Sequence, residues 1–213
     1  MAADFVPEYW DDACRHLARR DRVMRKLIPQ FGGARLQSRG DAFTTLARSI
    51  VGQQISVKAA QSVWDRFAAL LDGPSTRLRP TAVLALEGQR MRAAGLSARK
   101  IEYLKDLARH FDDGTVHVRQ WQHMDDEAIV EELVAIRGIG RWTAEMFLMF
   151  QEMRADVLPV DDIGLQRAVA IHYFDGERPT LGQLREVGET WRPYRSVATW
   201  YLWRSLDPIP VEY

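Results

Sequence analysis

The feature that most constrains this 213-residue chain is the stretch Leu133–Leu165. It reads LVAIRGIGRWTAEMFLMFQEMRADVLPVDDIGL, and it predicts a helix, a Gly-Ile-Gly turn, a second helix, and a third helix opened by Asp162. Ile129, Leu133 and Ile136 recur at i, i+4 and i+7, which favours a buried face on the first helix and leaves the turn at the surface. The sequence therefore presents a tight helical hairpin followed by an acidic residue.

Helical periodicity extends over most of the remaining chain. Asp41, Ser56 and Ser97 each precede an apolar-periodic segment, as an N-cap residue does. Val116–Val118 is the one segment that could form a short extended piece. The predicted class is all-α. Further helices are expected at Tyr9–Arg19, Asp21–Ile28, Thr81–Leu86, Asp126–Ile136, Arg141–Gln151, Asp162–Tyr173, Leu181–Glu189 and Tyr194–Ser205.

Composition narrows the function. A hydrophobic content of 46% suffices for a core, and 29 basic against 29 acidic residues leave no net charge to attract a nucleic acid, so any such attraction must come from local clustering and backbone dipoles. A single cysteine, Cys14, excludes internal disulfides, four-cysteine zinc sites and iron–sulfur clusters. The first residues lack a secretory signal, and no apolar run approaches about 18 residues. We expect an intracellular protein without a membrane partner, cytoplasmic and nucleoid-associated if bacterial.

The Gly-Ile-Gly turn suits a phosphate backbone. Gly138 and Gly140 can adopt positive φ and lack side chains, so a bulky ligand can approach the main chain. The next helix begins with free N–H groups that favour a phosphate, and Arg141 and Thr143 could add contacts that are blind to sequence. A dinucleotide-binding loop is rejected, because Thr143 stands in place of the third glycine and the preceding segment is helical. An ordinary interhelical turn remains the alternative.

The carboxylates that follow have two interpretations. Asp161 and Asp162 precede an apolar-periodic segment, so plain helix capping is the simple one. Two neighbouring acids also suggest a division of labour, in which one caps the helix and the other faces a cleft. Most of the seven tryptophans are expected in the core, while a few could stack on an extruded base.

Together these residues resemble the helix-hairpin-helix DNA glycosylase superfamily, and within it the DNA-3-methyladenine glycosylase II group. The superfamily hallmark is the hairpin with its downstream aspartate. Three further motifs occur in the family's order: SIVGQQISVKAA (Ser49–Ala60), GLSARK (Gly95–Lys100) and WRPYRS (Trp191–Ser196).

The resemblance implies a two-lobed helical fold with the active site in the cleft between the lobes. Residues 42–154 would form a central lobe that contains the hairpin, and residues 1–41 with 155–213 would form the second. The chain begins too late to include the N-terminal β-rich domain of longer members, so a compact form is expected.

The resemblance also implies roles for individual residues. Asp162 matches the catalytic aspartate, with Asp161 as the alternative, and either Gln53 or Gln54 would fill the gap left by a flipped base. The hairpin would hold Na⁺ or K⁺, if any, on the carbonyls of Val134, Ile136 and Ile139, and no other cofactor is expected. The base pocket would comprise Trp142, Tyr194, Met146 and Ile163, the last two standing where some relatives have tyrosines. DNA contacts would come from Gly138, Gly140, Arg141, Thr143, Gln53, Gln54, Ser56 and Lys58.

The expected activity is hydrolytic excision of alkylated purines such as 3-methyladenine and 7-methylguanine from double-stranded DNA, by a monomer. Strand-cleaving relatives carry a lysine where this chain has Trp142, so no abasic-site lyase activity is expected. The alternatives are a non-catalytic helix-hairpin-helix DNA-binding module and a glycosylase for oxidised bases. The five histidines show no metal or triad spacing.

Overall fold

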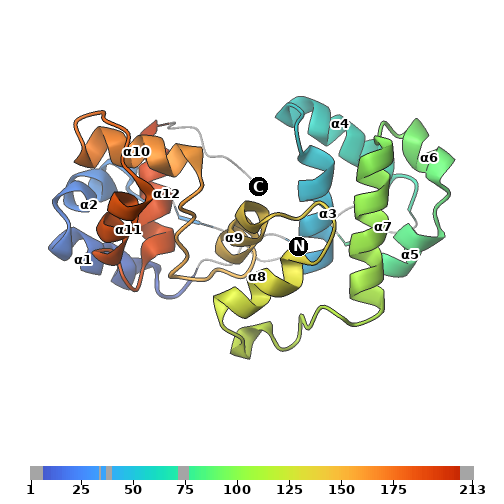
Figure 1. Ribbon diagram of the computed structural model, residues 1–213, viewed down its shortest axis with the longest axis horizontal. Coiled ribbons are helices and arrows are strands. Elements are labelled where there is room, and N and C mark those ends of the chain that lie inside the picture. Colours follow the sequence, from blue (N-terminus) through green and yellow to red (C-terminus); the bar gives the residue numbers. More distant parts are fainter. Residues whose placement is uncertain (1–6, 34, 37–39, 72–76, 207–213) are drawn as a thin grey trace. The chain divides into compact units, whose positions relative to one another are not determined.

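The computed structural model of the chain describes residues 7–33, 35–36, 40–71 and 77–206 (Figure 1). That part of the chain contains helices and no β-strand, which confirms the all-α class. None of its helices is long and apolar enough to cross a membrane. The helices are α1 (Trp10–Arg20), α2 (Arg22–Leu27), α3 (Ala42–Gly52), α4 (Val57–Ala68), α5 (Pro80–Ala85), α6 (Gly88–Ala93), α7 (Ala98–Asp112), α8 (Asp126–Val134), α9 (Arg141–Phe150), α10 (Ile163–Tyr173), α11 (Leu181–Glu189) and α12 (Arg195–Leu206), with 3₁₀ turns η1 (Ile28–Phe31) and η2 (Trp121–His123).

The helix starts follow the capping residues of the sequence. Asp41, Ser56 and Ser97 are the N-caps of α3, α4 and α7, and each side chain accepts a hydrogen bond from the backbone N–H three residues later, at 3.1, 3.3 and 3.3 Å. Each cap satisfies one of the amides that the first helical turn leaves without a partner. The three predicted starts are confirmed.

The extended piece expected at Val116–Val118 is wrong. These residues lie in a loop, and no strand pairs with them in the described part of the chain. The loop is instead fastened to α8 by Glu132, whose carboxylate accepts the backbone N–H of His117 at 3.1 Å and the indole N–H of the buried Trp121 at 2.8 Å. A single carboxylate therefore holds this loop on α8.

By their packing, the described residues form two units, which are considered separately. The terminal unit contains residues 7–33, 35–36 and 148–206, and the central unit contains 40–71 and 77–147. The lobe boundaries expected at residues 42 and 154 stay predictions. The packing units differ from them by a few residues because the segment from Leu148 to Arg154 packs with the terminal unit.

In the terminal unit, helices from both ends of the chain share one core. Helices α1 and α2 lie beside α12, and α12 also packs on α10; Figure 1 shows the blue N-terminal helices next to the orange and red C-terminal ones. Trp10, Leu17, Trp191 and Val197 are among the residues buried there. The sequence thus brings its termini together by burying aromatic and aliphatic side chains.

Asp21 connects three parts of this core. It is the N-cap of α2, and one carboxylate oxygen accepts the backbone N–H groups of Val23 (2.7 Å) and Met24 (2.9 Å). The other oxygen accepts the hydroxyl of Tyr173 at 2.9 Å and the indole N–H of Trp191 at 3.2 Å. A buried carboxylate needs such donors, and here they join α2 to α10 and to the segment before α12.

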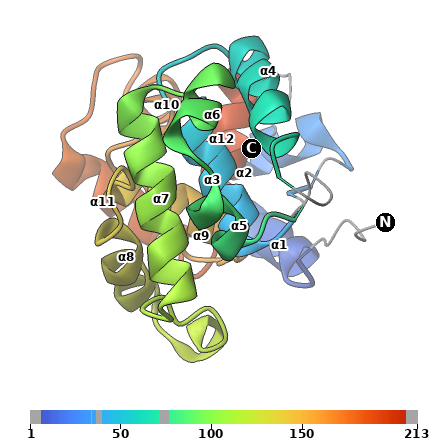
Figure 2. The same cartoon turned by 90° about the vertical axis from the view of Figure 1, so that its right-hand side faces the viewer.

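In the central unit, three helices pack around α7. It packs against α3, α5 and α6, and α4 packs on α3, as Figure 2 shows with α7 in green. Leu104 and Leu107 on α7 and Leu46 and Ile50 on α3 are buried. These apolar faces support the two surface turns that carry the candidate DNA contacts, one after α3 and one before α9.

Candidate functional site

The helical hairpin forms as the sequence predicts. Helices α8 and α9 are joined by a turn over residues 135–140, and Ile129, Leu133 and Ile136 are buried. Gly138 has φ +86°, and a Cβ there would lie 2.2 Å from Cδ2 of Tyr103 on α7. Gly140 has no positive φ, and a Cβ there would meet nothing within 4 Å. The expectation of positive φ thus holds only for Gly138, whose missing side chain makes room for Tyr103. Gly140 leaves open space.

Two further side chains fix the turn. The Asp106 carboxylate on α7 accepts the backbone N–H of Arg137 at 2.9 Å. The Gln53 side-chain amide donates to the carbonyl of Gly138 at 2.7 Å. Hydrogen bonds on both sides of Gly138, together with Tyr103, set the backbone before any ligand arrives. Such preorganisation lowers the entropy lost on binding.

In the loop after α3, the two glutamines that the sequence left as alternatives have different environments. Gln53 is partly buried and engaged with the hairpin, whereas Gln54 is exposed and has φ +59°. A non-glycine residue with positive φ is uncommon and marks a constrained turn. The Lys100 ammonium donates to the carbonyl of Val51 at 2.7 Å, and burial lowers its pKa. The Lys of the GLSARK motif therefore secures the end of α3 beneath this loop.

The remaining candidate DNA contacts of the central unit differ in availability. Lys58 is exposed on α4, and Thr143 is half-buried in the first turn of α9. Ser56 is occupied as a cap. Arg141 donates to both carboxylate oxygens of Glu127 on α8, at 2.7 and 2.5 Å. Its Nε also donates to the carboxylate of Glu145 on α9, at 3.2 Å. These hydrogen bonds raise the pKa of Arg141. These bonds use three of the five N–H donors of Arg141, and a phosphate contact by the others stays a prediction.

The expected cation ligands lie around the same turn. The carbonyl of Ile136 accepts the N–H of Ile139 at 3.1 Å, and Val134 is the last residue of α8. A carbonyl oxygen has a second lone pair, so this bond leaves room for a cation. Coordination by Val134, Ile136 and Ile139 stays a prediction.

In the terminal unit, Asp162 is the N-cap of α10 and is 9% exposed. Its Oδ1 accepts the backbone N–H of Leu165 at 2.6 Å and the indole N–H of Trp203 at 2.7 Å. The simple interpretation, helix capping, is confirmed for Asp162, and Asp161 is exposed in the turn before it. Which of the two acids faces a cleft stays a prediction. An N-cap side chain must turn back over the first helical amides, and this turn fixes the direction of the Asp162 carboxylate.

Trp203 is the residue that sequence reasoning did not place in the site. Its ring is stacked on Phe150, with centroids 5.9 Å apart and planes at 9°, and this stacking aims the indole N–H at Asp162. Gly164 keeps the space open, because a Cβ there would lie 3.1 Å from both Asp162 Oδ1 and Trp203 Cδ1. A tryptophan donor that needs a partner was the available signal, but seven tryptophans carry that signal equally.

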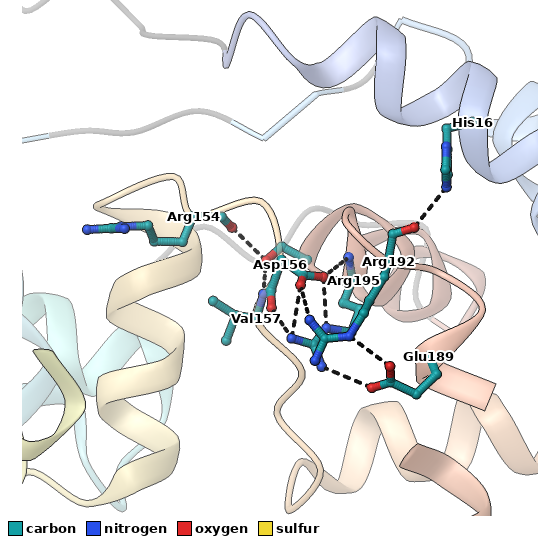
Figure 3. Close-up of polar contacts among 8 residues, drawn as sticks. His16, Arg154, Asp156, Val157, Glu189, Arg192 and Arg195 are labelled. Carbon is teal, nitrogen blue, oxygen red and sulfur yellow. Dashed lines mark hydrogen bonds and ion pairs between the residues drawn. The ribbon is translucent and has the colours of Figure 1, made fainter. Parts of the chain in front are cut away.

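The segment leading to Asp162 is braced by the WRPYRS motif (Figure 3). Arg195 Nε donates to the Asp156 carboxylate at 2.8 Å, and its Nη2 donates to the Asp156 carbonyl at 2.7 Å. The Ser196 hydroxyl donates to the carbonyl of Arg154 at 2.6 Å and accepts the N–H of the residue after Asp156 at 2.9 Å. Both motif residues thus hold the connector through which the chain reaches Asp162.

The expected base-pocket residues are divided between the units. Trp142 (40% exposed) and the buried Met146 belong to the central unit, and Ile163 (78% exposed) and Tyr194 belong to the terminal unit. Tyr194 stacks on Tyr9, with centroids 6.2 Å apart, and meets His16 edge-on at 5.3 Å. The ring contacts of Tyr194 are therefore made with α1 and the residue before it.

The hairpin geometry generates a paired prediction. Replacing Gly138 by Ala should lower the free energy of unfolding by about 2 kcal/mol or more, because the new methyl group meets Tyr103 at an unfavourable φ. Replacing Gly140 by Ala should change it by less than about 0.5 kcal/mol. Urea denaturation measures both, and equal effects at the two glycines would contradict the assigned role of Tyr103.

Comparison with known proteins identifies the family. Residues 47–193 match the model of the HhH-GPD superfamily of base excision DNA repair proteins. YfjP of Bacillus subtilis is 34% identical over 169 residues, which cover 78% of this chain, and the chain spans 59% of that relative's length.

Two solved structures share the fold. The 3-methyladenine DNA glycosylase of Schizosaccharomyces pombe, in complex with abasic DNA, has a TM-score of 0.79 and 30% identity, and the match covers 94% of this chain and 100% of that one. A DNA-3-methyladenine glycosidase of Bacillus halodurans has a TM-score of 0.80 and 33% identity, with 95% and 92% covered.

Proposed function

Because the chain belongs to the HhH-GPD superfamily of base excision DNA repair proteins, we propose that it is a monofunctional DNA glycosylase for alkylated purines. The substrates are bases of the 3-methyladenine and 7-methylguanine type in duplex DNA, and the product is an abasic site in an intact strand. The observation that carries this proposal is the orientation of Asp162, whose Oδ1 is held by two N–H donors. The likeness to glycosylases of this substrate class supports it.

Asp162 acts on the sugar. The C1′–N bond breaks, and its electron pair leaves with the base; a cationic alkylated base departs neutral and needs no general acid. The carboxylate stabilises the oxocarbenium ion that develops at C1′. Water then forms the C1′–O bond and releases its proton to Asp162 or to solvent. The acid is kept rigid by Leu165 and Trp203 so that it need not reorganise as charge develops.

The central unit supplies the grip on DNA. The amides at the start of α9 bind a phosphate, and the open space at Gly140 allows the backbone to approach. Gln54 enters the stack in place of the flipped base, since Gln53 is engaged with Gly138 and Gln54 is exposed. Flipping a damaged nucleotide costs only a few kcal/mol. The exposed Lys58 adds a phosphate contact on α4.

The residues proposed to contact the base are Trp142 and Met146 in the central unit, and Ile163 and Tyr194 in the terminal unit. The exposed indole of Trp142 offers a π face that favours a cationic base by about 0.5–2 kcal/mol. Neutral bases gain less from such a wall, and this difference sets the preference for alkylated purines. The enzyme acts as a monomer.

The catalytic assignment predicts a specific loss. Asp162→Asn should lower single-turnover release of labelled 3-methyladenine by about 10²-fold or more, because the charge opposite the sugar is removed. The Kd for abasic DNA should stay within about threefold, because the cap is preserved. Asp161→Asn is the matched control and should retain wild-type release. Loss in the control with full activity in Asp162→Asn would transfer the role by one residue.

The absence of a lysine after the hairpin predicts the outcome of chemical trapping. Trp142 occupies that position and has no amine, so no Schiff base can form there. Incubation with lesion DNA and sodium borohydride should yield no covalent adduct, while base is released in parallel samples. Efficient trapping by the wild type would contradict the monofunctional assignment.

A further inference from the structure

The terminal unit has a hollow whose charged side chains take no part in the proposed chemistry. It has a volume of about 450 Å³ and is lined by Asp12, Arg15, His16, Arg19, Arg20 and Tyr194. All but Tyr194 lie on α1, and Tyr194 belongs to the WRPYRS motif. Its walls are therefore one face of a helix and the aromatic ring that precedes α12.

The lining is basic in a chain with no net charge. Residues 15–26 contain six Arg or Lys and a single acid, the buried Asp21. Arg15 is paired with Asp12 at the rim of the hollow. Arg19 and Arg20 are exposed, and no hydrogen bond or ion pair of either side chain is seen within the described residues. Two guanidinium groups are thus available to a ligand.

The opposite wall is held in place. The His16 ring is 2.8 Å from the carbonyl of Arg192, and Figure 3 shows this contact joining α1 to the turn before α12. Tyr194 stands next to this turn with its ring against His16 and Tyr9. Arg192 in turn donates a hydrogen bond to the Asp156 carboxylate at 2.7 Å. The wall is therefore bonded to the same residue that Arg195 holds in the segment leading to Asp162.

One interpretation of Arg19 and Arg20 needs no ligand. They lie in the last turn of α1, where cations stabilise the helix dipole. This effect requires charge near the helix end but not a hollow, nor a fixed aromatic wall. Moreover, Arg25 already donates to the carbonyls of Ala18 (2.8 Å) and Arg19 (3.1 Å) at that end. The dipole therefore leaves the hollow unexplained.

We propose that this hollow binds a phosphodiester of the DNA backbone outside the lesion, as a second DNA contact. Arg19 and Arg20 grip the phosphate oxygens, since a guanidinium fork matches that geometry. The contact reads no sequence and suits an enzyme that scans. The inference rests on the proposed function for the identity of its partner.

The test compares two pairs of substitutions with equal loss of charge. Arg19→Gln with Arg20→Gln removes the two lining cations. The control, Arg22→Gln with Lys26→Gln, removes two exposed cations of α2 that do not line the hollow. The Kd for undamaged duplex DNA is measured over a range of salt concentrations. The first pair should weaken binding about tenfold and reduce the salt slope by about 1–2, and the control should leave the slope nearly unchanged.

Three outcomes overturn the proposal. Equal losses in both pairs would indicate general charge attraction, and unchanged binding would show that DNA does not contact the hollow. If the pair Arg19→Gln with Arg20→Gln lost binding to polyglutamate but bound DNA like the wild type, the hollow would be assigned to an acidic protein partner. Arg19→Lys with Arg20→Lys keeps both positive charges, so its salt slope should be close to that of the wild type. A lysine pair that behaved like the glutamine pair would show that charge is not what matters at these two positions.

Base release separates this inference from the proposed function. Single-turnover release at saturating enzyme should be unchanged in the glutamine pair, because Asp162 and Trp203 are untouched. If the wild type releases no base while the pair loses DNA affinity, the proposed function fails and the hollow stands. If the wild type releases base and the pair binds like the wild type, the hollow fails alone.

Discussion

In the terminal unit, two N–H donors from different helices hold one carboxylate oxygen in place. Asp162 Oδ1 accepts both a helical amide and the indole N–H of Trp203, and these bonds leave the side chain little freedom. The indole is itself fixed by stacking on Phe150, and Gly164 leaves the space in which the two side chains meet. A nearly buried acid held in this way is suited to stabilise a cationic transition state with little reorganisation.

In the central unit, side chains from other elements hold a backbone turn in place, much as Trp203 holds the side chain of Asp162 in the terminal unit. Tyr103 and Asp106 on α7 and Gln53 after α3 all act on the turn around Gly138. As a result, the loop that carries Gln54 is joined by a hydrogen bond to the hairpin whose amides we propose to bind phosphate. A substitution that moves the loop is therefore expected to move the hairpin as well, and the reverse.

The sequence predicted the features that depend on local chemistry. Caps at Asp41, Ser56 and Ser97 and the turn at Gly138 follow from neighbouring residues, and the structure has them as expected. Trp203 was not placed, because its partner lies 41 residues away and the chain offers several similar rings. Spacing within a helix cannot show which indole reaches which acid.

Long-range pairing also limited two other residues. Arg141 was expected to meet phosphate, and in the structure it is paired with Glu127, 14 residues earlier, which the sequence did not show. Tyr194 was expected in the base pocket, and its ring packs on Tyr9 and His16 from the other end of the chain. In both cases, tertiary contacts decide what a side chain of suitable chemistry can do.

The most direct measurement is single-turnover release of 3-methyladenine by Trp203→Phe, which keeps an aromatic ring to stack on Phe150 but is smaller and lacks the N–H donor. If the oriented carboxylate drives the reaction, release should slow by about 10-fold or more at saturating enzyme, with the affinity for abasic DNA and the unfolding midpoint nearly unchanged. Wild-type release by this variant would contradict the account.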